Sequence, residues 1–167
     1  MTLSISSRQA ALLLLLGCIT ALGGAMVAQF GFGLRPCILC LYQRAPFVLA
    51  GLLSLIALLP KTPTRLRLVL LGLCATALLV NSGIAVFHVG VEQHWWVGTP
   101  ECVPVVPVPK TLAEMQAALS APPPPRCDQA QWELFGISMA GFNVPYSLGL
   151  ALFAALAVFR SRKETSA

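Results

Sequence analysis

Four long apolar runs constrain this chain more than any other feature of its sequence. They cover about residues 9–30, 40–59, 66–89 and 144–159, and a helix needs roughly 20 apolar residues to cross a bilayer. Only 10% of the 167 residues are charged, whereas soluble domains average about 25%. The sequence therefore predicts an all-α membrane protein, a bundle of four transmembrane helices that forms a single domain over residues 1–167.

The first run could instead be a signal peptide, because Arg8 precedes it. Apolar regions of signal peptides usually span about 7–15 residues and end at a cleavage site with small residues. This run is longer and its best cleavage site is weak. We therefore expect it to be a retained helix.

The basic residues predict the orientation of the spans. They gather before the first span, between the second and third, and after the fourth: Arg8, Lys61, Arg65, Arg67, Arg160, Arg162 and Lys163. The two opposite loops, at about 31–39 and 90–143, contain more acids than cations. Because cytoplasmic loops carry the excess of Lys and Arg, both termini are expected in the cytoplasm. The net charge of +5 then reflects topology, and no nucleic-acid partner is expected.

The loop at 90–143 is the largest part of the chain outside the predicted spans. It is rich in proline, and the run Pro122–Pro125 favours extended polyproline geometry. Within it, Leu112, Met115 and Leu119 recur at helical spacing. We expect a short amphipathic helix over Thr111–Ala121, lying on the membrane surface. The alternative is an ordinary exposed helix.

Six cysteines fall into two groups. Cys18 and Cys74 lie inside apolar runs and are expected to be packing residues, because a free cysteine behaves as a small hydrophobe. The other four lie on the predicted outer side: Cys37, Cys40, Cys102 and Cys127. Cysteines in an oxidising compartment tend to pair. Cys37 with Cys40 forms a C-x-x-C at the mouth of a helix, and Cys102 and Cys127 are 25 residues apart in the long loop.

Three interpretations of these cysteines compete. Structural disulfides are plausible for the loop pair but poor for the C-x-x-C, because a disulfide that closes so small a ring constrains little chain. Small strained rings are usually the redox-active ones. A four-cysteine zinc site is disfavoured, since structural zinc sites typically use two closely spaced pairs. The C-x-x-C is therefore predicted to be redox-active, and no metal is expected.

Cys40 and Arg44 are predicted to act together. Cys40 falls in the first turn of a helix, where free amide groups favour a thiolate, and Arg44 lies four residues further along the same face. An arginine at membrane depth is a functional candidate, although it can also extend toward the interface. A reduced quinone with negative charge would suit it as a partner. Two cysteine pairs at one membrane face suggest a relay by disulfide exchange, and a lipid quinone is the obvious final acceptor.

Three segments resemble the disulfide bond formation protein B (DsbB) family of bacterial inner membranes. They are PCILCLYQR at Pro36–Arg44, KTP at Lys61–Pro63 and CDQAQWELFGISM at Cys127–Met139. The resemblance covers nearly the whole chain and includes the four-span plan. It implies an inner-membrane thiol:quinone oxidoreductase that supports disulfide formation in exported proteins. It also implies a bound ubiquinone or menaquinone and a periplasmic thioredoxin-fold partner of the DsbA type.

The resemblance also implies roles for single residues. Cys102, paired with Cys127, takes the attack of the partner thiolate, and electrons pass through an interloop Cys37–Cys127 bridge. Cys40 faces the quinone as a thiolate stabilised by Arg44. His88 and Met139 are further quinone-binding candidates, and Pro100 is expected to help hold an extended strand in the partner's groove.

The chain departs from the family pattern in several places. Gln43 stands where an acid precedes the quinone arginine, and His88 lies only close to the place of the family's histidine; His94 is a few residues away. The segment AGFNV after Met139 is an insertion relative to that pattern. Two other functions remain open: a reductase of the vitamin K epoxide reductase type, whose C-x-x-C comes after its loop cysteines, and a scaffold whose disulfides are only structural.

Overall fold

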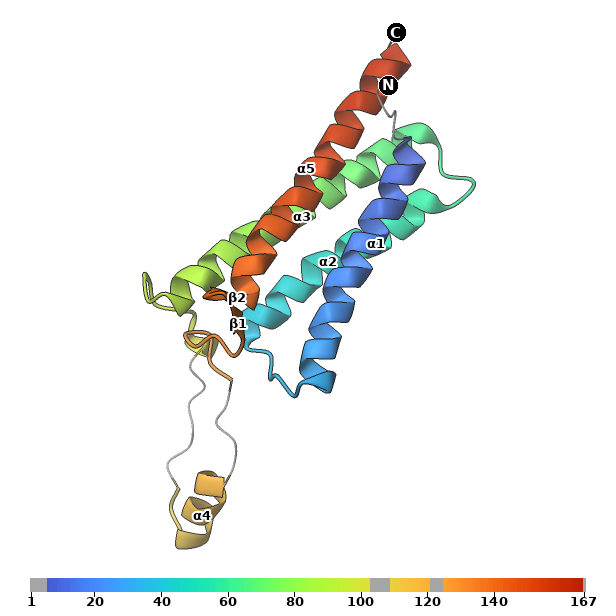
Figure 1. Ribbon diagram of the computed structural model, residues 1–167. Coiled ribbons are helices and arrows are strands. Elements are labelled where there is room, and N and C mark those ends of the chain that lie inside the picture. The colour runs from blue at the N-terminus through green and yellow to red at the C-terminus, as the bar shows by residue number, and fades with distance from the viewer. Residues whose placement is uncertain (1–5, 103–108, 121–124, 167) are drawn as a thin grey trace.

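The computed structural model describes residues 6–102, 109–120 and 125–166, and within them four helices are long and apolar enough to cross a membrane. They are α1 (Ser7–Met26), which continues into a π-helical turn (Val27–Gly31), then α2 (Ile38–Leu58), α3 (Thr64–Glu92) and α5 (Met139–Ser166). Figure 1 shows one bundle, with the start of α1 and the end of α5 at the same end. The predicted fold class is confirmed.

All four spans begin earlier than predicted, by two residues for α1, α2 and α3 and by five for α5. Helix α2 starts at Ile38 because Cys37 is its N-cap, with the sulfur accepting the Cys40 backbone N–H at 3.3 Å. Helix α5 starts at Met139, five residues before the predicted start of the fourth span. There the Ser138 hydroxyl accepts the Gly141 N–H at 3.0 Å, which satisfies one of the free amides of the first turn. The sequence pattern placed the start near Val144, after the polar residue Asn143, with Gly141 as the earliest position.

Small residues make up much of the bundle core between the end that carries both termini and the middle of the helices. Fully buried side chains there include Ala10, Ala11, Leu14, Ala50, Leu71 and Ala154. Without a hydrophobic driving force in lipid, helices associate by close packing, and small residues allow their backbones to approach. Cys18 and Cys74 belong to this core, as predicted.

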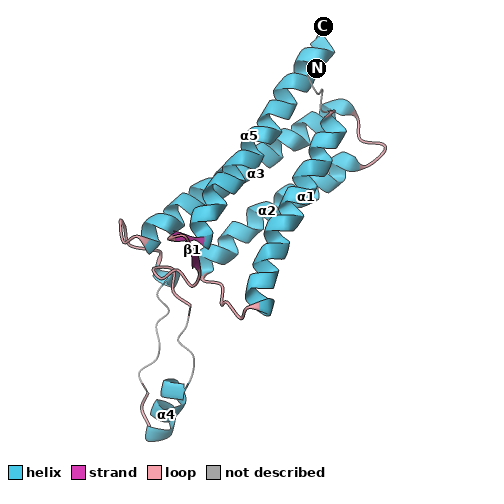
Figure 2. Cartoon of the chain, in the orientation of Figure 1, coloured by secondary structure: helices cyan, strands magenta, loops and turns pink. Residues whose placement is uncertain are grey.

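The described part of the loop between α3 and α5 contains a 3-10 turn (Pro100–Cys102), the short helix α4 and a hairpin. Strands β1 (Glu133–Leu134) and β2 (Ile137–Ser138) pair antiparallel, and the turn residues Phe135 and Gly136 both have positive φ (54° and 76°), as a type I′ turn requires. The hairpin, magenta in Figure 2, lies next to the start of α5. It delivers the chain directly into that helix.

The predicted short helix is present as α4 (Leu112–Ser120). It starts with a capping arrangement, in which the Thr111 hydroxyl accepts the Glu114 N–H and the Glu114 carboxylate accepts the Thr111 N–H, both at 3.2 Å. All of its residues are exposed, and Figure 1 shows it apart from the bundle. Its place on a membrane surface stays a prediction. Pro122–Pro124 of the expected polyproline run lie outside the described residues.

Candidate active site at the start of the second helix

The C-x-x-C lies at the junction between the short loop after α1 and helix α2. The sulfurs of Cys37 and Cys40 are 2.9 Å apart, within hydrogen-bonding distance. Cys37 is buried, whereas Cys40, one turn further along, is partly accessible. The pair therefore presents one sulfur to the loops and the other to the bundle.

The second cysteine pair packs against the first. Cys102 and Cys127 form a disulfide, and both are almost fully buried in a cluster that also contains Cys37, Leu39 and Val91. The Cys127 backbone N–H donates to the Cys102 carbonyl at 3.3 Å, which ties the two ends of the long loop together. All four outer cysteines therefore meet at one end of the bundle.

A close contact between Trp96 and α3 holds the chain that leads to Cys102. The indole stacks on Phe87, with ring centroids 5.9 Å apart, and its N–H donates to the Phe87 carbonyl at 2.9 Å. The ring lies directly over Gly90, where a Cβ atom would come within 2.0 Å of it. Only glycine fits at position 90, and this contact helps to set the path of the chain toward the disulfide.

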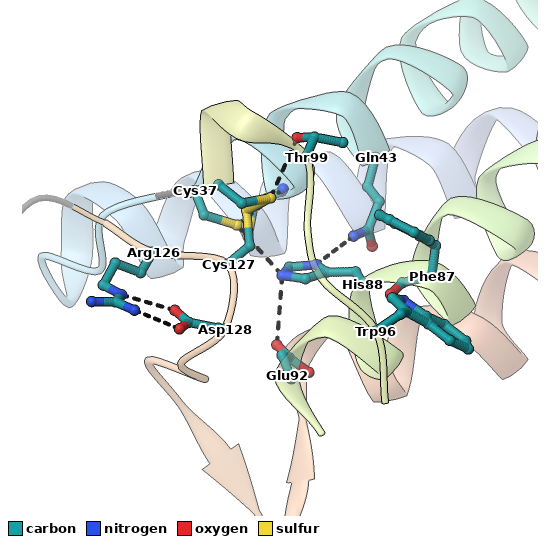
Figure 3. Close-up of a disulfide and its surroundings, with 12 residues drawn as sticks. Cys37, Gln43, Phe87, His88, Glu92, Trp96, Thr99, Arg126, Cys127 and Asp128 are labelled. Atoms are coloured by element: carbon teal, nitrogen blue, oxygen red, sulfur yellow. Dashed lines mark hydrogen bonds and ion pairs between the residues drawn. A yellow bond between two sulfur atoms is a disulfide. The ribbon is translucent and has the colours of Figure 1, made fainter. Parts of the chain in front are cut away.

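His88 connects the C-x-x-C to Gln43 of α2 and Glu92 of α3, as Figure 3 shows. It is buried, with Nε2 3.5 Å from the Cys37 sulfur and 3.7 Å from a Glu92 carboxylate oxygen. On its other side, Nδ1 is 2.8 Å from the side-chain nitrogen of Gln43. Ser138, at the start of α5, donates to Glu92. The imidazole is therefore held on both edges, with one nitrogen facing the sulfurs.

These contacts stabilise a thiolate on Cys37. The hydrogen bond from the Cys40 thiol lowers the pKa of Cys37 most; burial opposes it, and the hydrogen bond and positive field of His88 lower it further, to about 4. From the sequence, the thiolate was expected on Cys40 because this residue lies in the first helical turn. In the structure Cys37 caps that turn and accepts the free N–H itself, so the donors converge on Cys37 instead.

Arg44 is held by an irregular turn of the first span. Its guanidinium donates to the Gln29 side-chain oxygen at 2.7 Å, and Gln29 belongs to the π-helical turn Val27–Gly31. Such turns are rare and occur frequently at functional sites. The arginine is half-buried and has no carboxylate partner among the hydrogen bonds and ion pairs of the described residues. Its charge is thus available to a ligand.

Two adjoining cavities meet at this site. The smaller, about 70 Å³, lies toward the loops, and the larger, about 440 Å³, extends between α1, α2 and α5. Apolar side chains such as Leu22, Phe47, Phe142 and Tyr146 line most of the larger one. Both cavities are lined by four of the residues predicted for the site: Cys40, Arg44, His88 and Met139. Ligand sites are typically apolar clefts with a few polar groups, as this one is.

A buried chain of amides extends from the site into the bundle. Asn143 donates to the Gln43 side-chain oxygen at 2.6 Å and accepts the Ser147 hydroxyl at 2.8 Å, and Asn81 donates to Ser147 at 2.8 Å. Together with the Gln43–His88 contact it links α2, α3 and α5. Asn143 belongs to the inserted segment, and Gln43 replaces the expected acid. The two departures from the family pattern therefore bond to each other.

The sequence argument missed Gln29, Glu92, Ser138 and Asn143. Gln29 and Asn143 lie near the ends of spans, where polar residues are common, so their types alone gave no signal. Glu92 falls one turn after His88, and this i, i+4 spacing was the one available hint. His94 does not join the site; it has positive φ (59°) in the exposed turn after α3.

The structure combines a bundle of four membrane-spanning helices with a C-x-x-C that lies between a loop disulfide and an apolar cavity. These features define the class of multi-pass membrane proteins that carry out thiol–disulfide chemistry at one end of the bundle.

Comparison with known proteins gives the family. The model of the family described as "Disulfide bond formation protein DsbB" matches residues 7–157, and the chain belongs to this family. It is 32% identical over 146 residues to disulfide bond formation protein B 2 of Pseudomonas syringae pv. syringae, which covers 82% of this chain and 79% of the relative. It is 30% identical over 168 residues to disulfide bond formation protein B of Chromohalobacter salexigens, covering 93% and 95%. The chain is thus a membrane oxidoreductase of disulfide bond formation.

Proposed function

We propose that this protein reoxidises a periplasmic thioredoxin-fold protein of the DsbA type and passes the electrons to a membrane quinone. The observation that best supports this proposal concerns one apolar cavity next to a disulfide. It is lined by Cys40, Arg44, His88 and Met139. Family membership supports the disulfide chemistry. The cavity supports an apolar acceptor that enters from the lipid.

The residues of the larger cavity suit a quinone. The apolar walls would hold its ring, and the guanidinium of Arg44, which lines the same cavity, would hold a carbonyl oxygen. When bound, a quinone supplies a two-electron, two-proton acceptor. Ubiquinone and menaquinone share these features, and the cavity suits both.

The electrons would move inward by disulfide exchange. The partner dithiol is oxidised as Cys102–Cys127 is reduced, and Cys127 then exchanges with the oxidised Cys37–Cys40 pair through a Cys37–Cys127 bridge. In each exchange one S–S bond breaks and one forms. Membership of Cys37 and Cys127 in one buried cluster supports this route. The reduced Cys37–Cys40 pair finally loses two electrons and two protons to the quinone and becomes a disulfide again.

His88 would manage the proton at Cys37. Its Nε2 faces the sulfur, while Gln43 and Glu92 keep the ring in place. A neutral imidazole can accept a proton as the thiol ionises and return it during the reduction of the acceptor. Arg44, held by Gln29, would bind the negative charge that develops on the reduced acceptor.

The orientation is part of the proposal. Lys61 in the loop between α2 and α3, and Arg65 and Arg67 at the start of α3, lie at the end of the bundle opposite the cysteines. By the positive-inside rule, that end would face the cytoplasm. The cysteine end would then lie in the periplasm of a bacterium, at the outer face of the inner membrane.

The test is quinone reduction by the purified protein in detergent, with a reduced thioredoxin-fold protein as electron donor. The expected result is quinone loss that requires the donor and stops in Cys40→Ser, while the matched variant Cys74→Ala, which removes a core cysteine, behaves like wild type. Quinone that stays oxidised with several donors, while the outer cysteines remain disulfides, would refute the proposal and favour a structural role.

A further inference from the structure

The site contains a set of metal ligands that electron transfer alone does not explain. The sulfurs of Cys37 and Cys40 and an imidazole nitrogen of His88 all lie within 4.8 Å of one another. None of the three residues is exposed. Two thiolates and an imidazole form a ligand set that selects zinc over the hard cations.

The distances fit a tetrahedral site closely. With Zn–S of about 2.3 Å and Zn–N of about 2.0–2.1 Å, a sulfur and a nitrogen ligand lie roughly 3.6 Å apart, and two sulfurs roughly 3.8 Å. The Cys37 sulfur is 3.5 Å from His88 Nε2, so this edge is already in place. The two sulfurs, now 2.9 Å apart, would separate by about 0.9 Å. Small side-chain rotations at Cys40, which borders both cavities, can supply this.

The surroundings supply the rest of a coordination site. A histidine that binds metal usually donates its second N–H to a neighbouring acceptor, which fixes the ring. Gln43 contacts Nδ1 at 2.8 Å; its oxygen could accept that N–H only if the amide turned and gave up its bond from Asn143. A Glu92 carboxylate oxygen lies 3.7 Å from Nε2 and borders the same small cavity. Glu92 is the nearest protein candidate for a fourth ligand.

We propose that the reduced protein binds one Zn²⁺ through Cys37, Cys40 and His88, with Glu92 or water in the fourth position. Both sulfurs enter as thiolates and release any proton they hold, and no electron moves. Binding is exclusive with the Cys37–Cys40 disulfide, because disulfide sulfurs are no longer thiolates. Bound zinc would withdraw the pair from electron transfer, so free zinc would inhibit turnover; this consequence alone rests on the proposed function.

Cobalt is a suitable probe, because Co²⁺ takes the same ligands as Zn²⁺ and is coloured in a tetrahedral thiolate site. The protein would be the full chain in detergent with Cys102→Ala and Cys127→Ala, reduced with a phosphine that is then removed. We expect one Co²⁺ per chain with tetrahedral visible bands and a sulfur-to-cobalt band, both abolished by Zn²⁺ and by prior oxidation. Cys40→Ser should weaken the sulfur band, and His88→Gln should weaken cobalt binding at least about tenfold.

The matched control is the double variant Cys18→Ala, Cys74→Ala, which removes the core thiols and should keep the full cobalt spectrum. The inference is overturned if reduced protein gives no tetrahedral spectrum at one equivalent. It is equally overturned if the spectrum survives oxidation or the loss of both Cys37 and Cys40.

Quinone reduction by the unmutated protein in chelator-treated buffer separates this inference from the proposed function. Active protein whose reduced form binds no cobalt would refute the zinc site and leave the proposed function standing. Protein that binds cobalt as described but never reduces quinone would refute the proposed function and leave the zinc site standing. Inhibition of the active protein by Zn²⁺, relieved by chelator, would support both.

Discussion

Two pairs of cysteines with free sulfurs in the structure lie in the same bundle with opposite surroundings. Cys74, in the core, donates its thiol to the Ala50 carbonyl at 3.4 Å, and a carbonyl can only accept. Cys37, the N-cap of α2, accepts the Cys40 backbone N–H, and the Cys40 sulfur and His88 Nε2 lie 2.9 and 3.5 Å from its sulfur. An acceptor keeps a sulfur protonated, whereas donors favour the reactive thiolate. Both sulfurs are buried, so what distinguishes Cys37 is the imidazole and the second thiol beside it; Cys74 contacts the Ala50 carbonyl and the Ser54 hydroxyl instead.

Removal of either sulfur of the C-x-x-C should have the largest effect on activity. Cys37→Ser and Cys40→Ser should each reduce donor-dependent quinone reduction at least about a thousandfold, because a hydroxyl cannot form the disulfide. Turnover measured at saturating donor and quinone would show it. Substantial turnover in either variant would mean that electrons bypass this pair.

Arg44→Ala should have the next largest effect. We expect the KM for quinone to rise about 10- to 100-fold, since a charge-assisted contact of about 1.5–3 kcal/mol is lost. The loop disulfide should form normally, and Arg44→Lys should restore part of the affinity. Wild-type turnover of Arg44→Ala at low quinone concentration would contradict the assigned role.

His88→Leu should make Cys37 resemble a core cysteine. With the pKa of Cys37 at about 4, the wild-type thiolate persists from neutral pH down to about pH 5 and is lost as the pH falls through 4. Without the imidazole the pKa of Cys37 rises. Once this pKa exceeds 5, the rate of alkylation of the reduced protein at pH 5 should fall about tenfold for each further unit of pKa. Mass spectrometry of the Cys37 peptide, in chelator-treated buffer, gives the rate. An unchanged pH profile would assign the thiolate to the Cys40 contact alone.

Asn143→Leu tests the amide chain, with a smaller effect. The variant breaks one bond between helices, to Gln43, and one within α5, to Ser147; a hydrogen bond between membrane helices averages only about 0.6 kcal/mol. We expect unfolding in mixed micelles to become easier by about 1–2 kcal/mol, with a modest loss of turnover because Gln43 no longer orients His88. A free energy of unfolding equal to that of wild type would show that the chain of amides contributes nothing to stability.

Cys18→Ala and Cys74→Ala should have the smallest effects. Each removes one buried sulfur from a close-packed core, at a cost comparable to that of Ile→Val, about 1 kcal/mol. Quinone reduction should stay at the wild-type level. A strong loss of activity with intact folding would place these thiols in the chemistry and erase the contrast drawn above.

The sequence predicted the bundle because apolar length is a nearly sufficient signal for a membrane helix. Cys37, Cys40, Arg44 and His88 could be named because their types and spacing carry chemistry. Which of the two cysteines holds the thiolate could not be predicted, because it depends on Cys37 acting as a helix cap. That contact is set by loop geometry. The start of α5 was missed for a related reason: it is fixed by the Ser138 cap and the hairpin before it, whereas the polar Asn143 interrupts the apolar pattern one turn later.

The π-helical turn at Val27–Gly31 makes this protein sensitive to single-codon deletions in one place. An α-helix advances about 100° per residue, and a π turn accommodates one additional residue without altering the helix before it. Loss of Ala28 would restore a regular turn, leaving the core contacts of Leu14 and Cys18 intact. It would also turn Gln29 by roughly 100° away from Arg44. An in-frame deletion that spares folding could therefore still release the arginine on which the proposed acceptor site depends.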